Sequence, residues 1–167
     1  MIRRPLTSIA ALAVFAMAVN TQFGISQIGS MDAPAKPRAY VVYAAESQSV
    51  RAGKAATLEL RFQIVPGFHV NSHTPKSQLL IPTALTLQPA SGIKAGALEY
   101  PAGKPFSFSF DPNDKLDVYA GDFTLKLPVV ATPGDHTIDG ILKYQACDSA
   151  SCYPPRTVPV KVVFTAR

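Results

Sequence analysis

The chain has 167 residues and carries 16 basic against 11 acidic side chains, which gives a formal net charge of +5. The basic residues are scattered singly, whereas a nucleic-acid-binding surface needs them clustered, so we expect no nucleic-acid partner. Hydrophobic residues make up 47% of the chain, and two of its residues are cysteines.

The first 18 residues have the features of a cleaved secretory signal. Arg3 and Arg4 precede an apolar run from Ile9 to Val19 that contains the small-x-small pattern Ala16-Met17-Ala18. The run is short of the roughly 20 residues that a membrane-spanning helix needs, so a retained anchor is the weaker alternative. We expect cleavage after Ala18 and a periplasmic or secreted protein whose basic residues fall from 16 to 14, because two of them lie in the signal.

Residues 19–38 mix Gln, Gly, Ser, Ala and Pro without apolar periodicity, which is typical of a flexible leader. Residues 39–167 then have the length of one ordinary domain with a core of its own.

The pattern of this domain is that of strands. Every even-numbered side chain of Thr57–Ile64 is apolar, the same alternation recurs at Asp122–Val129, and Val158–Val162 gives a third strand. Shorter strand candidates between turn signals are Tyr40–Ala45, Phe68–Ser72, Leu85–Gln88, Ala97–Tyr100 and Thr137–Tyr144. With no sustained helical period, the sequence predicts an all-β, immunoglobulin-like antiparallel β-sandwich, with a small antiparallel barrel as the alternative.

The cysteines, Cys147 and Cys152, lie in one short run. In the chain-entropy model, a bridge closing so small a loop stabilises a fold by about 2 kcal/mol, against about 4 for a loop of some sixty residues. Outside the cytosol such a pair tends to be oxidised. The short loop and the Tyr-Pro-Pro exit favour a redox-active disulfide over a structural clip that holds a hairpin tip. Asp148–Ser151 supplies turn residues, and Pro154 and Pro155 remove backbone donors, which leaves the sulfurs approachable. The spacing does not say which sulfur a partner attacks.

A second run places His69, Asn71 and His73 on one strand face, with Phe68 and Val70 on the other. The imidazoles could shuttle a proton or hydrogen bond a sulfur at a redox site, and a solvated outer face is the equal alternative. A metal site built from His69, His73 and the two thiols is a weaker possibility, because it matches no recognised ligand spacing.

A third run, Lys104–Tyr119, contains Phe106, Phe108 and Phe110 before a turn expected at Asp111–Asp114. Three aromatic residues on one strand face are normally core packing. The alternative is a mobile flap whose tip carries an aromatic shield.

These residues resemble the amino-terminal periplasmic domain of the thiol:disulfide interchange protein DsbD. The resemblance lies in Tyr-Gln-Ala-Cys and Cys-Tyr-Pro-Pro within 144–155, Pro-Gly-Phe-His-Val-Asn at 66–71 with Leu-Ile-Pro-Thr at 80–83, Tyr-Pro-x-Gly at 100–103 and Val-Tyr-x-Gly at 118–121. Together these motifs span about residues 40 to 165 in the order of the family.

The resemblance implies an immunoglobulin-like sandwich in which Cys147 and Cys152 cycle between dithiol and disulfide, flanked by His69, Asn71 and Tyr153. It also implies a cap over the cysteines from the loop 108–114, with Phe110 as the first choice of shielding residue and Phe108 as the second. Such domains receive electrons from a thioredoxin-like domain and pass them to exported thiol oxidoreductases. Because the chain ends at Arg167, we expect a separate donor, with a membrane electron transporter in trans.

Our leading hypothesis is therefore an exported thiol:disulfide exchange module that needs no cofactor or metal and acts as an electron relay more than as a self-sufficient enzyme. The alternatives are a non-catalytic binding or assembly domain with a structural disulfide clip, and periplasmic delivery of a metal such as copper.

Overall fold

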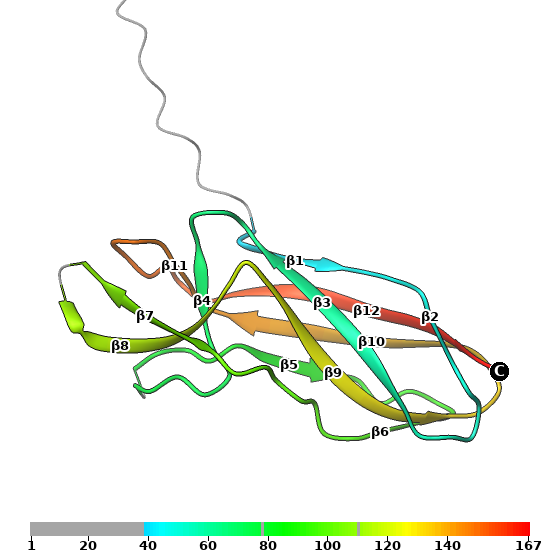
Figure 1. Ribbon diagram of the computed structural model, residues 1–167. Coiled ribbons are helices and arrows are strands. Elements are labelled where there is room, and N and C mark those ends of the chain that lie inside the picture. Colours follow the sequence, from blue (N-terminus) through cyan, green and yellow to red (C-terminus); the bar gives the residue numbers. More distant parts are fainter. Residues whose placement is uncertain (1–38, 78, 110) are drawn as a thin grey trace, which may run out of the picture. The chain divides into compact units, whose positions relative to one another are not determined.

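The computed structural model describes residues 39–77, 79–109 and 111–167, and the expected signal and leader lie outside this part of the chain. The described residues form twelve strands and no helix (Figure 1). No helix in these ranges is therefore long and apolar enough to cross a membrane.

The strands form three sheets of four. Sheet A has the order β1 (Val41–Ala44), β3 (Ala56–Ile64), β9 (Asp122–Ala131), β6 (Ile93–Ala95). Sheet B has the order β2 (Gln48–Val50), β12 (Arg156–Ala166), β10 (Gly134–Tyr144), β5 (Ala84–Leu87). Sheet C has the order β11 (Ala146–Cys147), β4 (His69–Asn71), β8 (Asp111–Ala120), β7 (Lys104–Phe108). Neighbouring strands run antiparallel, except that β2 pairs with β12 in parallel.

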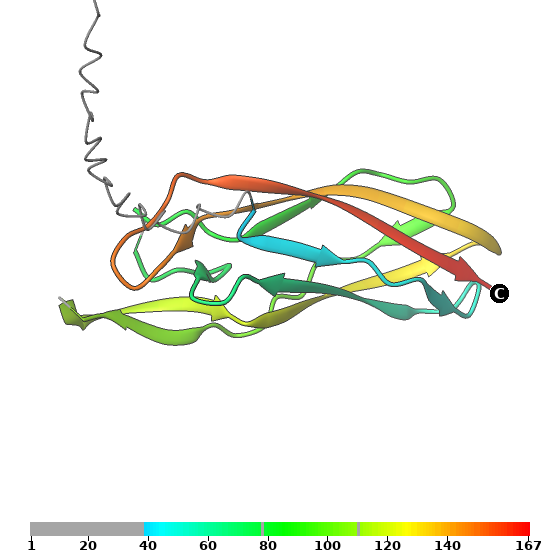
Figure 2. The same ribbon diagram turned by 90° about the horizontal axis from the view of Figure 1, so that it is seen from above.

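The core lies between sheets A and B, which Figure 2 shows as two layers. In β3, Leu58, Leu60 and Phe62 are fully buried, whereas the residues between them are exposed. Apolar residues of β12, such as Val162 and Phe164, face this layer from sheet B. Burying side chains of this size contributes about 1.5 to 3 kcal/mol each, so the alternating pattern itself fixes which face of each strand points inward. Neither cysteine belongs to this core cluster.

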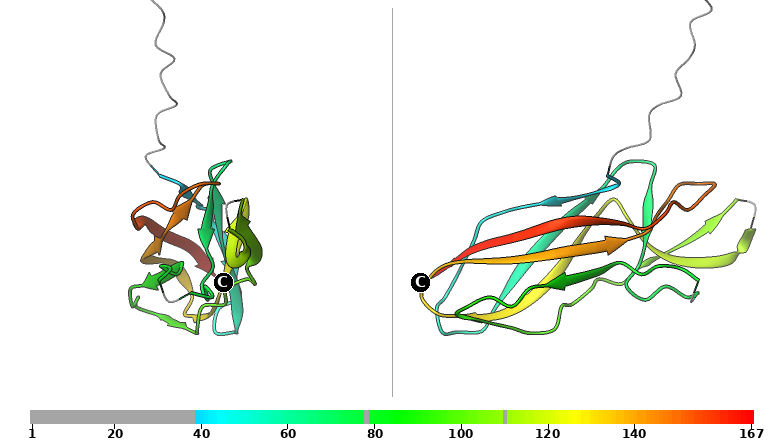
Figure 3. Two further views of the ribbon diagram at one scale, coloured as in Figure 1. Left: turned by 90° about the vertical axis from the view of Figure 1, so that its left-hand side faces the viewer. Right: turned by 180° about the vertical axis from the view of Figure 1, so that it is seen from behind.

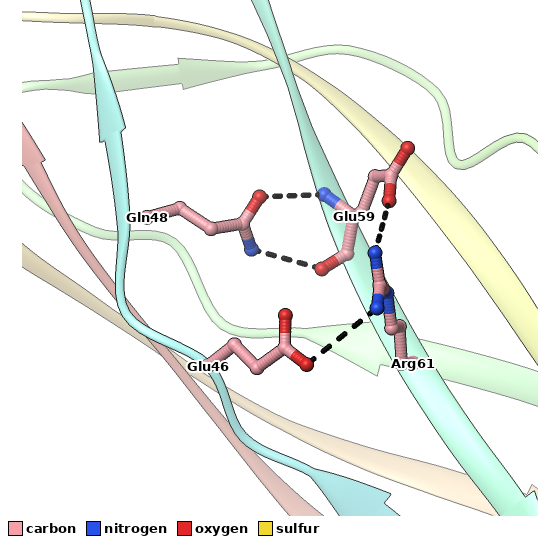
Figure 4. Close-up of polar contacts among 4 residues, drawn as sticks. All are labelled: Glu46, Gln48, Glu59 and Arg61. Atoms are coloured by element: carbon pink, nitrogen blue, oxygen red, sulfur yellow. Dashed lines mark hydrogen bonds and ion pairs between the residues drawn. The ribbon is translucent and has the colours of Figure 1, made fainter.

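The chain crosses from sheet A to sheet B between β1 and β2, and one side chain holds the crossing. The side-chain amide of Gln48 donates to the carbonyl of Glu59 at 2.8 Å and accepts from its N–H at 2.9 Å (Figure 4). Arg61 forms exposed ion pairs with Glu59 and Glu46 beside it. Exposed pairs of this kind contribute little, so the two amide hydrogen bonds carry the attachment.

Sheet C lies at the end of the sandwich opposite the C terminus (Figures 1 and 3). At this end lie the turn that follows β11, the β7–β8 hairpin and the segments 72–77 and 79–83. β10 leads almost directly into β11 through Gln145, so a central strand of the sandwich delivers Cys147 to this end.

The immunoglobulin-like β-sandwich predicted from the sequence is confirmed, and so are the strands built on clear alternation. The strand expected at Ala97–Tyr100 is wrong, because only an isolated bridge forms there, between Glu99 and Lys126. The β6–β9 ladder stops beside Pro128, which accepts a bond from Gly96 but has no N–H to return.

The turn expected at Asp111–Asp114 is also wrong. Phe108 pairs with Asp111, so the hairpin turns before Asp111, and β8 already begins there. Phe106 pairs with Leu116 but Phe108 pairs with Asp111, so β8 has more residues than β7 between these two pairs. The shift of register between Phe106 and Phe108 accommodates them. Pro112 fits because β4 pairs with β8 only from Val118 onward, so its missing N–H interrupts no ladder on that side.

Candidate functional site

Cys147 and Cys152 form a disulfide and face each other as an isolated antiparallel pair. Their Cα atoms are 3.9 Å apart. Backbone hydrogen bonds lie on either side of the pair, from Tyr153 N–H to the Ala146 carbonyl at 2.8 Å and from Asp148 N–H to the Ser151 carbonyl at 2.9 Å. The bridge therefore spans a small hairpin, which we call the cysteine hairpin (residues 146–153).

The carboxylate of Asp148 organises the turn of this hairpin. Its Oδ1 atom accepts from the N–H groups of Ala150 and Ser151, both at 2.8 Å. Its Oδ2 atom accepts from the hydroxyl of Tyr153, and this bond raises the pKa of Tyr153 above its ordinary value. An Asp that bonds backbone two and three residues on is a common way to fix a turn, so the side chain holds both arms of the hairpin together.

The two cysteines differ sharply in exposure. Cys147 is fully buried, whereas Cys152 is exposed at the start of the Tyr-Pro-Pro segment. Pro154 and Pro155 have no N–H group and lie outside the strands, so no ladder covers Cys152 from that side. A partner in solution therefore meets Cys152 first.

On the other side of Cys147 lies β4. Cys147 pairs with His69, and Ala146 pairs with Val70. The N–H of Asn71 donates to the Gln145 carbonyl at 3.3 Å, and its side-chain amide donates to Gln145 Oε1 at 3.1 Å. Directly opposite side chains share a face, so His69 and Asn71 lie on the cysteine side of sheet C.

His69 and Asn71 are 4% and 0% exposed, so this face is not the solvated surface considered as an alternative. The Nε2 atom of His69 is buried and has no hydrogen-bond partner. Burial lowers the pKa of His69 below its ordinary value, and the negative charge of Asp148 opposes the shift in part. The imidazole is therefore neutral at neutral pH.

Aromatic residues of β7 cover His69. The ring of Phe106 lies 4.0 Å from the imidazole, centroid to centroid, and that of Phe108 lies 6.2 Å away. The two phenylalanines meet edge to face, at 5.4 Å. β7 thus contributes a lid of apolar side chains to the cysteine side of sheet C, whereas Phe110 lies outside the described residues.

Tyr153 lies on the opposite flank of the hairpin, in an aromatic cluster. Its ring stacks on Tyr40 at 5.2 Å and lies 6.0 Å from Phe68. The guanidinium of Arg156 lies over the other ring of that stack, 4.5 Å from the centroid of Tyr40. Stacking and cation–π contacts of this kind hold the exit of the hairpin against the sandwich.

His73 does not join His69. It follows β4 and is exposed, and its ring stacks on that of Tyr100 with 3.6 Å between the ring centroids. The backbone N–H of His73 donates a hydrogen bond to the hydroxyl of Tyr119 at 3.1 Å. Tyr119 in turn donates to the carbonyl of Pro101 at 3.0 Å. Within the described ranges, no group of three or more His, Cys, Asp or Glu side chains is placed to hold a metal ion.

Sequence reasoning missed two residues of this site. Phe106 was treated as core, although it packs against His69. Gln145, which joins β10 to β11, was passed over. Its Oε1 atom also accepts a hydrogen bond from the backbone N–H of Ile81 and so ties residues 79–83 to the start of the cysteine hairpin. The turn expected at Asp148–Ser151 is present, and the structure adds that the side chain of Asp148 holds it.

Fold and site together define a β-sandwich domain that carries a disulfide between nearby residues at one end, with one cysteine of the pair exposed and the other buried. The family model described as "Thiol:disulfide interchange protein DsbD, N-terminal" matches residues 37–163. The chain therefore belongs to this family, as its motifs predicted.

Three of the solved structures similar to this chain are domains of DsbD or ScsB. The reduced DsbD N-terminal domain of Neisseria meningitidis is 19% identical, with 65% of this chain and 81% of that chain covered and a TM-score of 0.42. The complex of the DsbD and PilB N-terminal domains of that organism gives 20% identity, coverage of 63% and 73%, and a TM-score of 0.42. The N-terminal periplasmic domain of ScsB from Proteus mirabilis gives 12% identity, coverage of 73% and 44%, and a TM-score of 0.48. No curated protein matches the chain.

Proposed function

We propose that this protein is an exported thiol:disulfide exchange module that relays reducing equivalents between thioredoxin-like partners through Cys147 and Cys152. The observation that carries the proposal is the unequal exposure of a very local disulfide: Cys152 is exposed and Cys147 is fully buried. Membership of a family named for thiol:disulfide interchange supports it.

The bridge suits exchange better than reinforcement. The cysteines are five positions apart, so closing the loop contributes only about 2 kcal/mol in the chain-entropy model. The hydrogen bonds of Asp148 already fix the same turn without the bridge. Reduction of the disulfide therefore leaves a preformed hairpin in which the thiols stay close together.

The exposed sulfur sets the direction of attack. A donor thiolate attacks Sγ of Cys152, the bond between the cysteines breaks, and the electron pair leaves with Cys147 as a thiolate. The donor's second cysteine, as a thiolate, then attacks the donor sulfur that is bonded to Cys152. This step oxidises the donor, releases Cys152 and leaves the module as a dithiol. Delivery to an acceptor disulfide is the reverse sequence, begun by the Cys152 thiolate.

The resemblance to the DsbD family suggests the partners. The donor is a thioredoxin-like domain or protein, served by a membrane electron transporter in trans, and the acceptors are exported thiol oxidoreductases. The periplasmic or secreted location rests on the signal in residues 1–18 and on the family match. His69, Asn71 and Tyr153 flank the pair, with the lid of Phe106 and Phe108 beside it.

The equilibrium of the pair with glutathione tests the proposal. We expect a reduction potential above about −300 mV, because inert structural bridges have lower values. In the Cys147→Ser variant, Cys152 should form a lasting mixed disulfide with an oxidised thioredoxin-like protein, since the resolving thiol is gone. The matched Cys152→Ser variant should form none. A potential below about −300 mV, or equal trapping by both variants, contradicts the relay.

A further inference from the structure

His69 has a buried, unpartnered nitrogen and lies on the face of sheet C that also carries Cys147. It is the direct register partner of Cys147, and the neighbouring pair, Asn71 and Gln145, shows side chains of these two strands meeting on that face. Opposite residues of an antiparallel pair have Cβ atoms about 4.5 to 5.5 Å apart. The register therefore places the imidazole and the Cys147 side chain next to each other on one face of sheet C, without a hydrogen bond to Nε2 in the disulfide form.

The buried sulfur has a proton to gain and lose. When Cys147 leaves as a thiolate it must be protonated, and when it attacks Cys152 it must first lose its proton, because only the thiolate is a nucleophile. Cys147 is fully buried and Phe106 closes the lid over His69, so bulk water does not reach the sulfur readily. A group inside the site must handle the proton.

We propose that His69 is the proton acceptor for the Cys147 thiol when Cys147 attacks the mixed disulfide at Cys152, and the proton donor in the reverse step. This inference rests on the proposed function and deepens it. Among the residues that the structure describes, Nε2 of His69 is the one buried side-chain nitrogen without a hydrogen-bond partner, so it is available to take the proton.

The surroundings of His69 suit an acceptor. The groups that face it are Cys147 and Asp148 from the cysteine hairpin, the two lid phenylalanines from β7, and Ala120 from β8. Burial holds the imidazole in its neutral form, which can accept a proton. Asp148, the charged member of this set, stabilises the imidazolium that forms.

The step balances without a further reactant. Nε2 of His69 takes the proton of the Cys147 thiol, and the resulting thiolate attacks Sγ of Cys152. The bond between Cys152 and the partner sulfur breaks, and the partner leaves as a thiolate with the electron pair. The cysteines are oxidised to a disulfide, the partner is reduced, and His69 passes its proton to solvent.

Ordinary acidities set the size of the effect. A thiol with a pKa of about 8.5 is only about 3% ionised at pH 7, so assistance in removing its proton is worth up to about 30-fold in rate. Without His69 the rate should instead rise with pH up to the pKa of the thiol. With His69 it should level off above the pKa of the imidazole, which lies below 6.5.

The test uses the reduced protein and dithiobis(nitrobenzoate), a disulfide whose thiolate is coloured. Cys152 releases the first thiolate when it forms the mixed disulfide, and attack by Cys147 releases the second. We expect the second phase of His69→Phe to be slowed about 10- to 30-fold at pH 7 and to keep rising with pH. His69→Gln, whose side chain is polar but does not titrate, should show the same slowing and the same pH dependence as His69→Phe. Near-ultraviolet circular dichroism checks that each variant is folded.

His136→Phe is the matched control. His136 stacks on Phe164 at the end of β10 remote from the cysteine hairpin, so its replacement should leave both phases unchanged. Wild-type kinetics and pH profile in either folded His69 variant would overturn the role of His69. Absence of a second phase from the wild-type protein would instead overturn the exchange function itself.

Discussion

Replacement of Asp148 by alanine should make the disulfide easier to reduce. The carboxylate accepts two backbone N–H groups at 2.8 Å and the Tyr153 hydroxyl, and so holds the cysteine hairpin closed. Without these bonds the turn is less ordered in the reduced variant than in the reduced wild-type protein. Forming the disulfide then costs additional conformational entropy, because the turn must be ordered again. Removing the negative charge also stabilises the thiolates. Both effects favour the dithiol and raise the reduction potential.

The magnitude follows from the hydrogen bonds. Losing two bonds to a charged acceptor in a half-exposed turn costs about 1.5 to 3 kcal/mol. Since 1.4 kcal/mol corresponds to 30 mV for a two-electron couple, we expect the potential of Asp148→Ala to rise by about 30 to 65 mV. The assay is equilibration in glutathione buffers, with the thiols trapped by alkylation and counted by mass.

Two matched variants separate the contributions. Asp148→Asn keeps an acceptor oxygen but loses the charge, and Tyr153→Phe loses only the hydroxyl bond, so both should shift the potential less than alanine does. A potential for Asp148→Ala that is unchanged or lower than that of the wild type would refute the reasoning, because both physical effects have the same sign.

Three further results are expected. Because burial lowers the pKa of His69, the unfolded chain binds its proton more readily below about pH 6.5. The free energy of unfolding in urea should therefore fall from about pH 7 to about pH 5, and should fall less in His69→Gln. Phe106→Ala should speed alkylation of the Cys147 thiol in a protein lacking the other cysteine, and should do so more than Phe108→Ala, whose ring lies farther from the imidazole. Tyr119→Phe should lower the free energy of unfolding by about 1 to 2 kcal/mol, because two hydrogen bonds are lost, with the reduction potential unchanged.

The sequence revealed those parts of the fold that depend on local pattern. Alternation along Thr57–Ile64 and Asp122–Val129 predicted two central strands of sheet A, because burial on one face imposes a period of two. The two-residue β11 has no such pattern, and its pairing with β4 joins segments far apart in the chain. A strand this short is defined by its partner and not by its own residues.

The parts of the site that depend on local sequence pattern were also predictable, and those that depend on contacts between distant segments were not. The run 144–155 pointed to the cysteines, and the face of His69 and Asn71 was evident from strand alternation. Which aromatic residue covers that face was not evident, because it depends on the register shift between Phe106 and Phe108 and on the twist of the β7–β8 hairpin. The unequal exposure of the two cysteine residues also required the fold, since it follows from the position of Cys147 between His69 and Cys152.

The hydrophobic cluster between sheets A and B includes neither sulfur. Opening the disulfide therefore uncovers none of the apolar surface that holds the domain together. The proposed exchange would therefore act on a six-residue segment outside the cluster that holds the two sheets together. We therefore expect the proposed cycles of oxidation and reduction to leave the domain folded, with its aggregation-prone apolar core covered throughout.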